Sequence, residues 1–140
     1  TAESCTSGII AAGLTKTPGS SSYYRGGINA YSNDVKTGVL GVDSVIIKEY
    51  GAVSQECACD MAVKCAELFR TDCAISVTGI AGPDGGTAEK PVGLVYVGIY
   101  YKEAVCVHKF LFSGNREIIR QRAAVMALFE MLKTINRMGK

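Results

Sequence analysis

The pattern of apolar and polar positions predicts two long and two short helices. Apolar residues recur at helical spacing along residues 54–70 and again along 115–138, which is typical of amphipathic helices that pack one face on a core. A short apolar run over residues 8–14 predicts a helix that ends before Pro18, and residues 35–40 predict another. Helices therefore account for about half of the predicted elements.

Extended segments lie between these helices. The apolar run 73–77 and the partly alternating runs 92–101 and 105–112 are typical of strands, and the last two are close enough to form a hairpin. Residues 23–31 are also expected to be extended. Strands interleaved with amphipathic helices predict an α/β fold, a single domain with a mixed sheet covered by helices in three layers.

Composition limits the kind of protein. The chain has 140 residues, enough for one domain with a complete core. Its 15 basic and 13 acidic side chains nearly balance, so its charge does not indicate binding to nucleic acid. No apolar run approaches the roughly 18 residues of a membrane span. The six cysteines match no zinc or redox spacing and lie mostly in apolar patterns. We therefore expect free thiols, no metal site and a cytoplasmic location.

Residues 18–36 carry the clearest candidate chemistry, because a serine-rich turn precedes Tyr31 and Lys36 over a short distance. We predict that Ser21 is a nucleophile, Lys36 its base and Tyr31 the residue that links them. Lys36 falls in the first turn of a short helix, where the helix dipole disfavours a cation. A lysine base needs its pKa lowered from about 10.4 to roughly 7–8, so Lys36 should be buried.

A cluster of hydroxyl side chains precedes the first helix and allows two interpretations. Ser4, Thr6 and Ser7 can cap the free N–H groups of the helix start, or they can line a pocket that favours an anion. Cys5 lies in the same cluster and is an alternative nucleophile. It would need a histidine partner, and His108 lies in a strand pattern where a structural role is expected.

A glycine-rich loop, residues 78–86, directly follows the apolar strand 73–77. Its backbone N–H groups could approach a phosphate or carbonyl oxygen closely, although it has neither the lysine nor the spacing of a P-loop. A plain long turn is the alternative. Arg116 and Arg120, near the start of the last helix, could reach a phosphate or simply be solvated.

Several blocks of sequence together resemble the CinA C-terminal domain family. They are Ala2–Thr6, Pro18–Ser21, Tyr31–Asn33 with Lys36, Gly51–Ser54, Thr78–Gly86 and Lys90–Gly93. The family includes nicotinamide mononucleotide deamidases, so the resemblance implies a cytoplasmic bacterial amidohydrolase without a metal or cofactor. It acts on a small molecule in pyridine nucleotide salvage, and we expect a homo-oligomer with no nucleic-acid or membrane partner.

The resemblance also implies roles for individual residues. Ser21, Tyr31 and Lys36 carry over as the catalytic set. The substrate-binding positions are Ser4, Cys5, Thr6, Ser7, Gly8, Thr78, Gly79, Gly82 and Arg120.

Two departures from the family qualify this expectation. Ser7 replaces a usual glycine, which could narrow the pocket or add a hydrogen bond, and the family's first helix and strand are missing before Thr1, so residues 1–140 would be a shortened domain. The alternative function is a non-catalytic nucleotide-binding or interaction module of a CinA-type competence or damage-inducible protein.

Overall fold

The computed structural model describes residues 1–138, and its centre is a five-stranded mixed sheet in the order β2-β1-β3-β4-β5. The strands are β1 (Ala2–Glu3), β2 (Ile28–Asn29), β3 (Cys73–Gly79), β4 (Leu94–Tyr101) and β5 (Ala104–Leu111). β1 runs parallel to both β2 and β3, whereas β3, β4 and β5 are antiparallel to their neighbours. The predicted hairpin is therefore β4–β5.

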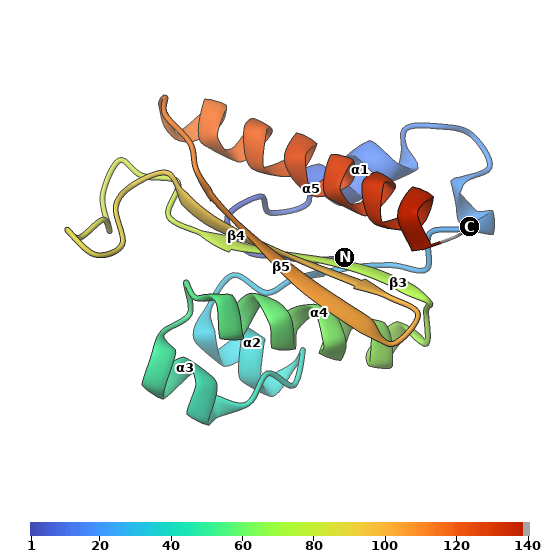
Figure 1. Ribbon diagram of the computed structural model, residues 1–140, viewed down its shortest axis with the longest axis horizontal. Coiled ribbons are helices and arrows are strands. Elements are labelled where there is room, and N and C mark those ends of the chain that lie inside the picture. The colour runs from blue at the N-terminus through green and yellow to red at the C-terminus, as the bar shows by residue number, and fades with distance from the viewer. Residues whose placement is uncertain (139–140) are drawn as a thin grey trace.

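Helices cover both faces of the sheet (Figure 1). They are α1 (Ile9–Thr15), α2 (Asn33–Gly38), α3 (Ser44–Tyr50), α4 (Gln55–Phe69) and α5 (Arg116–Met138). α1 and α5 lie on one face, and α2, α3 and α4 lie on the other. The predicted α/β fold with a mixed sheet between two helical layers is confirmed. Within residues 1–138 no helix has the length and apolar character that crossing a bilayer requires.

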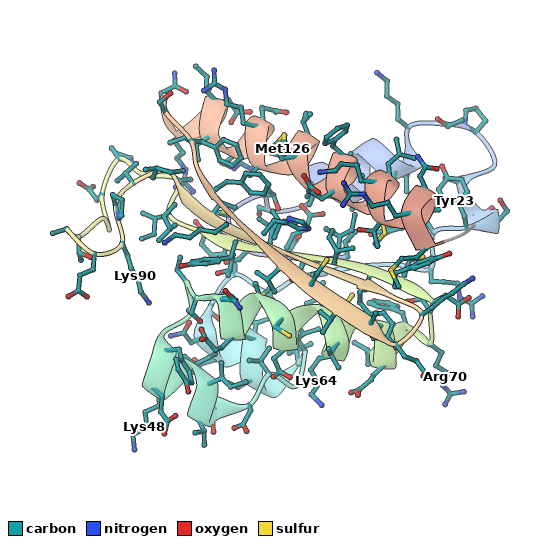
Figure 2. All side chains as sticks on the ribbon, in the orientation of Figure 1. Tyr23, Lys48, Lys64, Arg70, Lys90 and Met126 are labelled. Atoms are coloured by element: carbon teal, nitrogen blue, oxygen red, sulfur yellow. The ribbon has the colours of Figure 1, made fainter. Side chains whose placement is uncertain are left out.

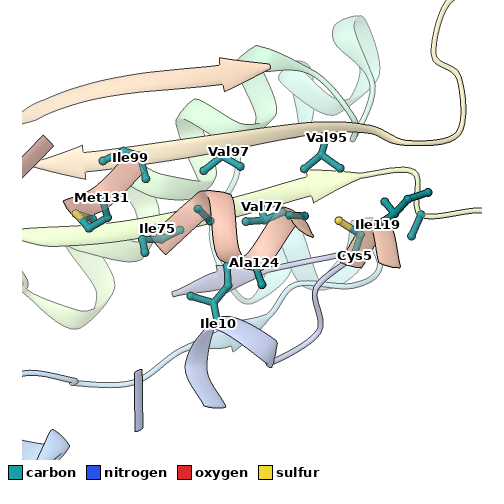
Figure 3. Packing of buried hydrophobic residues seen from close by; sticks show 13 residues of the cluster. Cys5, Ile10, Ile75, Val77, Val95, Val97, Ile99, Ile119, Ala124 and Met131 are labelled. Carbon is teal, nitrogen blue, oxygen red and sulfur yellow. The ribbon is translucent and has the colours of Figure 1, made fainter. Parts of the chain in front are cut away.

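Each helical layer packs on its own apolar core. On the α1 and α5 side, Ile10, Val77, Val97 and Ile119 are fully or almost fully buried (Figure 3). On the other side, α4 contributes Met61 and other buried residues to a second cluster. Each large side chain of this kind contributes about 1.5–3 kcal/mol when removed from water. The two cores fix both helical layers to the sheet.

Some short elements were not predicted. β1 has two residues, too few for a period to show, and a 3₁₀ turn, Ser20–Ser22, lies inside the serine-rich stretch. β2 lies within the segment 23–31 that was expected to be extended, but it has only two residues. α3 was also missed, although Asp43 caps it by accepting a hydrogen bond from the Val45 N–H at 2.8 Å. Three β-branched residues, Val45 to Ile47, lie in this helix, and their low helix propensity is the reason that the sequence did not indicate it.

Candidate active site

A pocket of about 210 Å³ opens where β1 and β3 end. These two strands are parallel, so their carboxyl ends meet at the same edge of the sheet, a common place for ligands in α/β folds. The residues that line it are Ser4, Cys5, Tyr31, Asn33, Lys36, Ala52, Val53, Thr78, Gly79, Ala81 and Arg116. Segments far apart in the sequence therefore meet in one cavity.

Lys36 is buried in the wall of this pocket, with 2% of its surface exposed. Its Nζ donates hydrogen bonds to the carbonyl oxygens of Ala30 at 2.7 Å and Tyr31 at 3.2 Å, and to Ser4 Oγ at 3.2 Å. Burial lowers the pKa of Lys36 from its ordinary value, because desolvation disfavours the ammonium form. The burial expected of a lysine base is thus observed.

Ser4 comes directly after β1 and faces Lys36. Its backbone N–H donates to the Val77 carbonyl at 2.9 Å, which extends the β1–β3 ladder by one residue and fixes the position of the serine. Ser4 is 8% exposed, and its Oγ accepts the hydrogen bond from Lys36 Nζ. A neutral lysine in this position can take a proton from a serine hydroxyl.

Ser21 lies elsewhere, and this corrects its predicted place beside Lys36. It is exposed in the 3₁₀ turn Ser20–Ser22 and does not line the pocket. Figure 2 shows Tyr23, just after this turn, at the opposite end of the molecule from Lys90, which lies in the loop beyond β3. The physical reason is the path of the chain: α1 runs away from the pocket, and the Tyr23 hydroxyl anchors the turn by donating to the Leu14 carbonyl at 2.6 Å.

The start of α1 is occupied by a side chain of the protein itself. The buried carboxylate of Glu3 accepts hydrogen bonds from the N–H groups of Gly8 at 2.9 Å, Ile10 at 3.1 Å and Ala11 at 2.8 Å. The hydroxyl cluster therefore does not cap the helix, and of its hydroxyl residues only Ser4 lines the pocket. The helix start is capped by Glu3, and it offers no free site for a substrate anion.

The rest of the hydroxyl cluster lies outside the pocket. Thr6 is fully buried and Gly8 donates its N–H to Glu3, so neither lines the cavity as expected. Ser7 has an exposed side chain and a φ of 50°, a left-handed conformation that glycine adopts without strain. This conformation explains why a glycine suits the position. Ser7 does not narrow the pocket.

Tyr31 and Arg116 meet at the mouth of the pocket. Tyr31 is 57% exposed, and its hydroxyl accepts a hydrogen bond from Arg116 Nη2 at 3.0 Å. Arg116 Nη1 donates to the Gly82 carbonyl at 2.9 Å, so the guanidinium links α5 to the loop after β3 and to the segment before α2. Tyr31 reaches Lys36 through its backbone carbonyl rather than its hydroxyl.

Arg120 and Gly82 do not line the pocket, contrary to their predicted binding roles. The guanidinium of Arg120 donates to the carbonyls of Cys5 at 2.9 Å and Thr6 at 3.3 Å and pairs with Glu117 at 3.0 Å. The N–H groups of the Arg120 guanidinium are therefore bonded to acceptors of the protein itself. Arg120 holds the turn after Ser4 in place.

The other wall of the pocket is built by β3 and the segment before α4. Thr78 and Gly79 line it as predicted, and the Thr78 hydroxyl donates to the Ala52 carbonyl at 2.7 Å. Thr78 thus holds Ala52 and Val53 in place beside the cavity. These two residues and Asn33 were not predicted, because nothing in their local pattern indicates a pocket that only the sheet assembles.

The alternative Cys5–His108 pair is not assembled. Burial raises the pKa of the Cys5 thiol to about 11, so the thiol is neutral near pH 7. His108 lies on β5, where its Nε2 is 3.6 Å from Glu130 and 3.5 Å from the sulfur of Cys106. All six cysteines are free thiols.

The fold and the site define a small α/β domain with a buried lysine and a serine paired at the end of its parallel strands. The chain belongs to the CinA family: the CinA C-terminal domain matches over residues 1–135. A CinA-like protein from Thermosipho melanesiensis is 50% identical over 136 residues, which are 96% of this chain and 34% of that protein. A putative competence-damage inducible protein from Clostridium kluyveri is 50% identical over 127 residues, or 91% of this chain and 31% of its own length.

Solved structures agree with this assignment. The competence/damage inducible protein CihA from Agrobacterium tumefaciens has a TM-score of 0.92 and 42% identity, covering 96% of this chain and 82% of that structure. The competence damage-inducible protein A from Klebsiella pneumoniae has a TM-score of 0.94 and 30% identity, with 98% and 85% covered. The chain spans about one third of the length of the curated relatives it matches.

Proposed function

We propose that this domain is an amidohydrolase that converts nicotinamide mononucleotide and water to nicotinic acid mononucleotide and ammonia. The observation that carries the proposal is the hydrogen bond between Lys36 Nζ and Ser4 Oγ inside a pocket. A buried lysine with a lowered pKa beside a serine is the arrangement that Ser-Lys hydrolases use to activate the hydroxyl. The serine that the geometry selects is Ser4, not Ser21.

The reaction follows from this geometry. Neutral Lys36 takes the proton of Ser4 as Oγ attacks the carboxamide carbon. The tetrahedral intermediate then breaks its C–N bond, and ammonia leaves with the proton that the Lys36 ammonium returns. Water, activated by the same lysine, hydrolyses the ester that remains on Ser4 and releases the carboxylate product. The acid that forms ionises to the carboxylate, and its proton converts ammonia to ammonium, so the cycle balances in atoms and charge.

The pocket suits the pyridine end of the substrate. Its volume of about 210 Å³ lies below the roughly 300–1,000 Å³ of sites that enclose a drug-sized ligand. The ring and carboxamide would fill it, and the ribose phosphate would extend past its mouth. Arg116 lies at that mouth and carries the charge that a phosphate needs. A neutral Lys36 also avoids repelling the positively charged pyridinium ring.

The decisive experiment is turnover of nicotinamide mononucleotide by the purified protein, followed by ammonia release and by chromatography of the nucleotide product. We expect ammonia and nicotinic acid mononucleotide in equal amounts. Two further compounds are tested for comparison. Nicotinamide riboside lacks the phosphate, and free nicotinamide lacks the whole ribose phosphate. Binding of the mononucleotide without turnover would instead identify a non-catalytic nucleotide-binding module.

A further inference from the structure

The end of β3 presents a backbone donor to the pocket. Ile80 donates its N–H to the Leu94 carbonyl at 2.9 Å, which places Ile80 among the residues of β3 that bond to β4. Because neighbouring residues of a strand point their N–H groups to opposite sides, the N–H of Gly79 points toward β1. Val77 shows the same orientation, since its carbonyl accepts the Ser4 N–H.

β1 is too short to bond with this donor. It ends at Glu3, and the next carbonyl, that of Ser4, accepts the Ser7 N–H at 3.1 Å. Among residues 1–138, no acceptor forms a hydrogen bond with the Gly79 N–H. Gly79 lines the pocket beside Ser4, so this free donor lies at the cavity wall.

A second free donor follows Ser4 directly. In the turn from β1 to α1, the N–H groups of Ser7, Gly8 and Ile9 are all paired within the turn or with Glu3. The N–H of Cys5 has no oxygen acceptor in the described part of the chain and meets only its own sulfur, and Cys5 lines the same pocket. This donor is separate from the start of α1, whose N–H groups Glu3 occupies.

We propose that the N–H groups of Cys5 and Gly79 form the oxyanion hole of the site, an inference that rests on the function proposed above. When Ser4 Oγ bonds to the carboxamide carbon, the π electrons of the C=O bond move to the oxygen. The two N–H groups donate hydrogen bonds to that negative oxygen without transferring a proton. A serine in a strand-to-helix turn, with a donor from the next residue, is an arrangement suited to this task.

The glycine at position 79 is required by its packing on β4. A Cβ there would lie 2.7 Å from the Leu94 carbonyl oxygen and 2.7 Å from Val95 Cγ2. These contacts are shorter than side chains tolerate, so the strand keeps a bare backbone beside the pocket. The N–H can therefore approach a bound carbonyl without a side chain in the way.

The test is to remove one N–H at a time. The full chain is assembled by peptide ligation at its own cysteines, with glycolate in place of Gly79, so that an ester replaces the amide. A second protein carries the matching hydroxy acid in place of Cys5. Glycolate in place of Gly85, an exposed loop glycine outside the pocket, is the control. We expect kcat to fall about 100- to 1,000-fold for each of the first two proteins.

In the two ester proteins, the KM and the affinity for the product nucleotide should change little. The oxyanion hole stabilises the tetrahedral intermediate more than it stabilises bound substrate or product. A merely structural defect would weaken ligand binding and lower the unfolding temperature together. If both ester proteins keep the kcat of the Gly85 control, the oxyanion hole is assigned wrongly. If the unmodified chain itself fails to turn over the mononucleotide, the proposed function fails first.

Discussion

The Nζ of Lys36 lies 3.2 Å from the Oγ of Ser4, although 32 residues separate them in the sequence. The sheet brings them together, because Ser4 follows β1 and the chain returns beside β1 as β2 before it enters α2. The carbonyls of Ala30 and Tyr31 accept hydrogen bonds from Lys36 Nζ and hold it beside Ser4. The proposed catalytic pair is thus a product of the parallel strands and not of one local motif.

The first prediction separates the two candidate serines. Ser4→Ala removes the hydroxyl that Lys36 contacts, and we expect kcat to fall by about 10⁴-fold or more, as for loss of a serine nucleophile. Ser21→Ala should keep the activity of the unchanged protein, because Ser21 is exposed outside the pocket. Ammonia release under saturating substrate measures both. The opposite result would return the nucleophile to Ser21.

The second prediction concerns the pH dependence of the rate. Lys36 acts as a base only when neutral, so kcat/KM should rise with pH through its lowered pKa and then level off. Lys36→Met should abolish most activity and remove this limb from whatever activity remains. Lys48→Met, which changes an exposed lysine of α3, should leave the profile as it is. A limb that survives in Lys36→Met would exclude Lys36 as the base.

The third prediction concerns stability and follows from the same pKa. At a pH below the folded-state pKa of Lys36, both folded and unfolded chains hold its proton, and folding bears the full cost of burying the charge. As the pH rises from that value toward the ordinary 10.5, the folded state releases the proton while the unfolded state keeps it. The contribution of Lys36 to stability therefore becomes less unfavourable with rising pH.

Urea unfolding in a series of buffers that ends near pH 10.5 measures this effect. We expect the free energy of unfolding of the unchanged protein, minus that of Lys36→Met, to increase along the series. The same difference taken against Lys48→Met should stay level. If the difference in unfolding free energy between the unchanged protein and Lys36→Met stays constant along the series, burial does not lower the pKa of Lys36.

The sequence predicted what periodicity and residue type can specify. The amphipathic pattern of residues 54–70 became α4, with Ser54 Oγ accepting the Cys57 N–H at 3.1 Å as its cap. Lys36 was expected to be buried because a lysine base needs a lowered pKa, and it is buried, although it lies in the last turn of α2 and not in the first as predicted. The pairing partner of Lys36 was missed, because a two-residue strand such as β1 has no period and Ser4 therefore looked like a helix cap.

The role of Glu3 was missed for a related reason. A buried carboxylate that accepts N–H groups five, seven and eight residues ahead matches none of the local capping patterns, which operate over two or three residues. Arg116 was noticed only as one of two arginines near a helix start. Its contact with Tyr31 spans 85 residues and depends on how α5 lies on the sheet.

The fourth prediction tests the cap of α1. Glu3→Gln keeps the size of the side chain, but its amide nitrogen would face a backbone N–H in place of an oxygen. We expect a loss of about 1–3 kcal/mol in the free energy of unfolding, the cost of leaving a buried donor without an acceptor. Glu117→Gln, which alters an exposed pair with Arg120, should cost less than about 1 kcal/mol. Equal losses in the two variants would contradict the role of Glu3.

The fifth prediction assigns the phosphate to Arg116. Arg116→Met removes a cation at the mouth of the pocket but keeps much of the side chain's length. We expect the KM for nicotinamide mononucleotide to rise roughly 10- to 100-fold, equivalent to about 1.5–3 kcal/mol for a hydrogen bond to a charged group. Arg122→Met is the matched control, because Arg122 also lies on α5 but donates to the Ser113 carbonyl at 2.8 Å outside the pocket.

Nicotinamide riboside distinguishes phosphate binding from support of the pocket wall. Arg116 also donates to the Gly82 carbonyl and the Tyr31 hydroxyl, so its loss could loosen the mouth of the pocket without any effect specific to phosphate. If Arg116 binds the phosphate, Arg116→Met raises the KM for the mononucleotide and leaves the KM for the riboside almost unchanged. If both KM values rise by the same factor, Arg116 only positions Tyr31 and the loop after β3, and the phosphate is bound by another group.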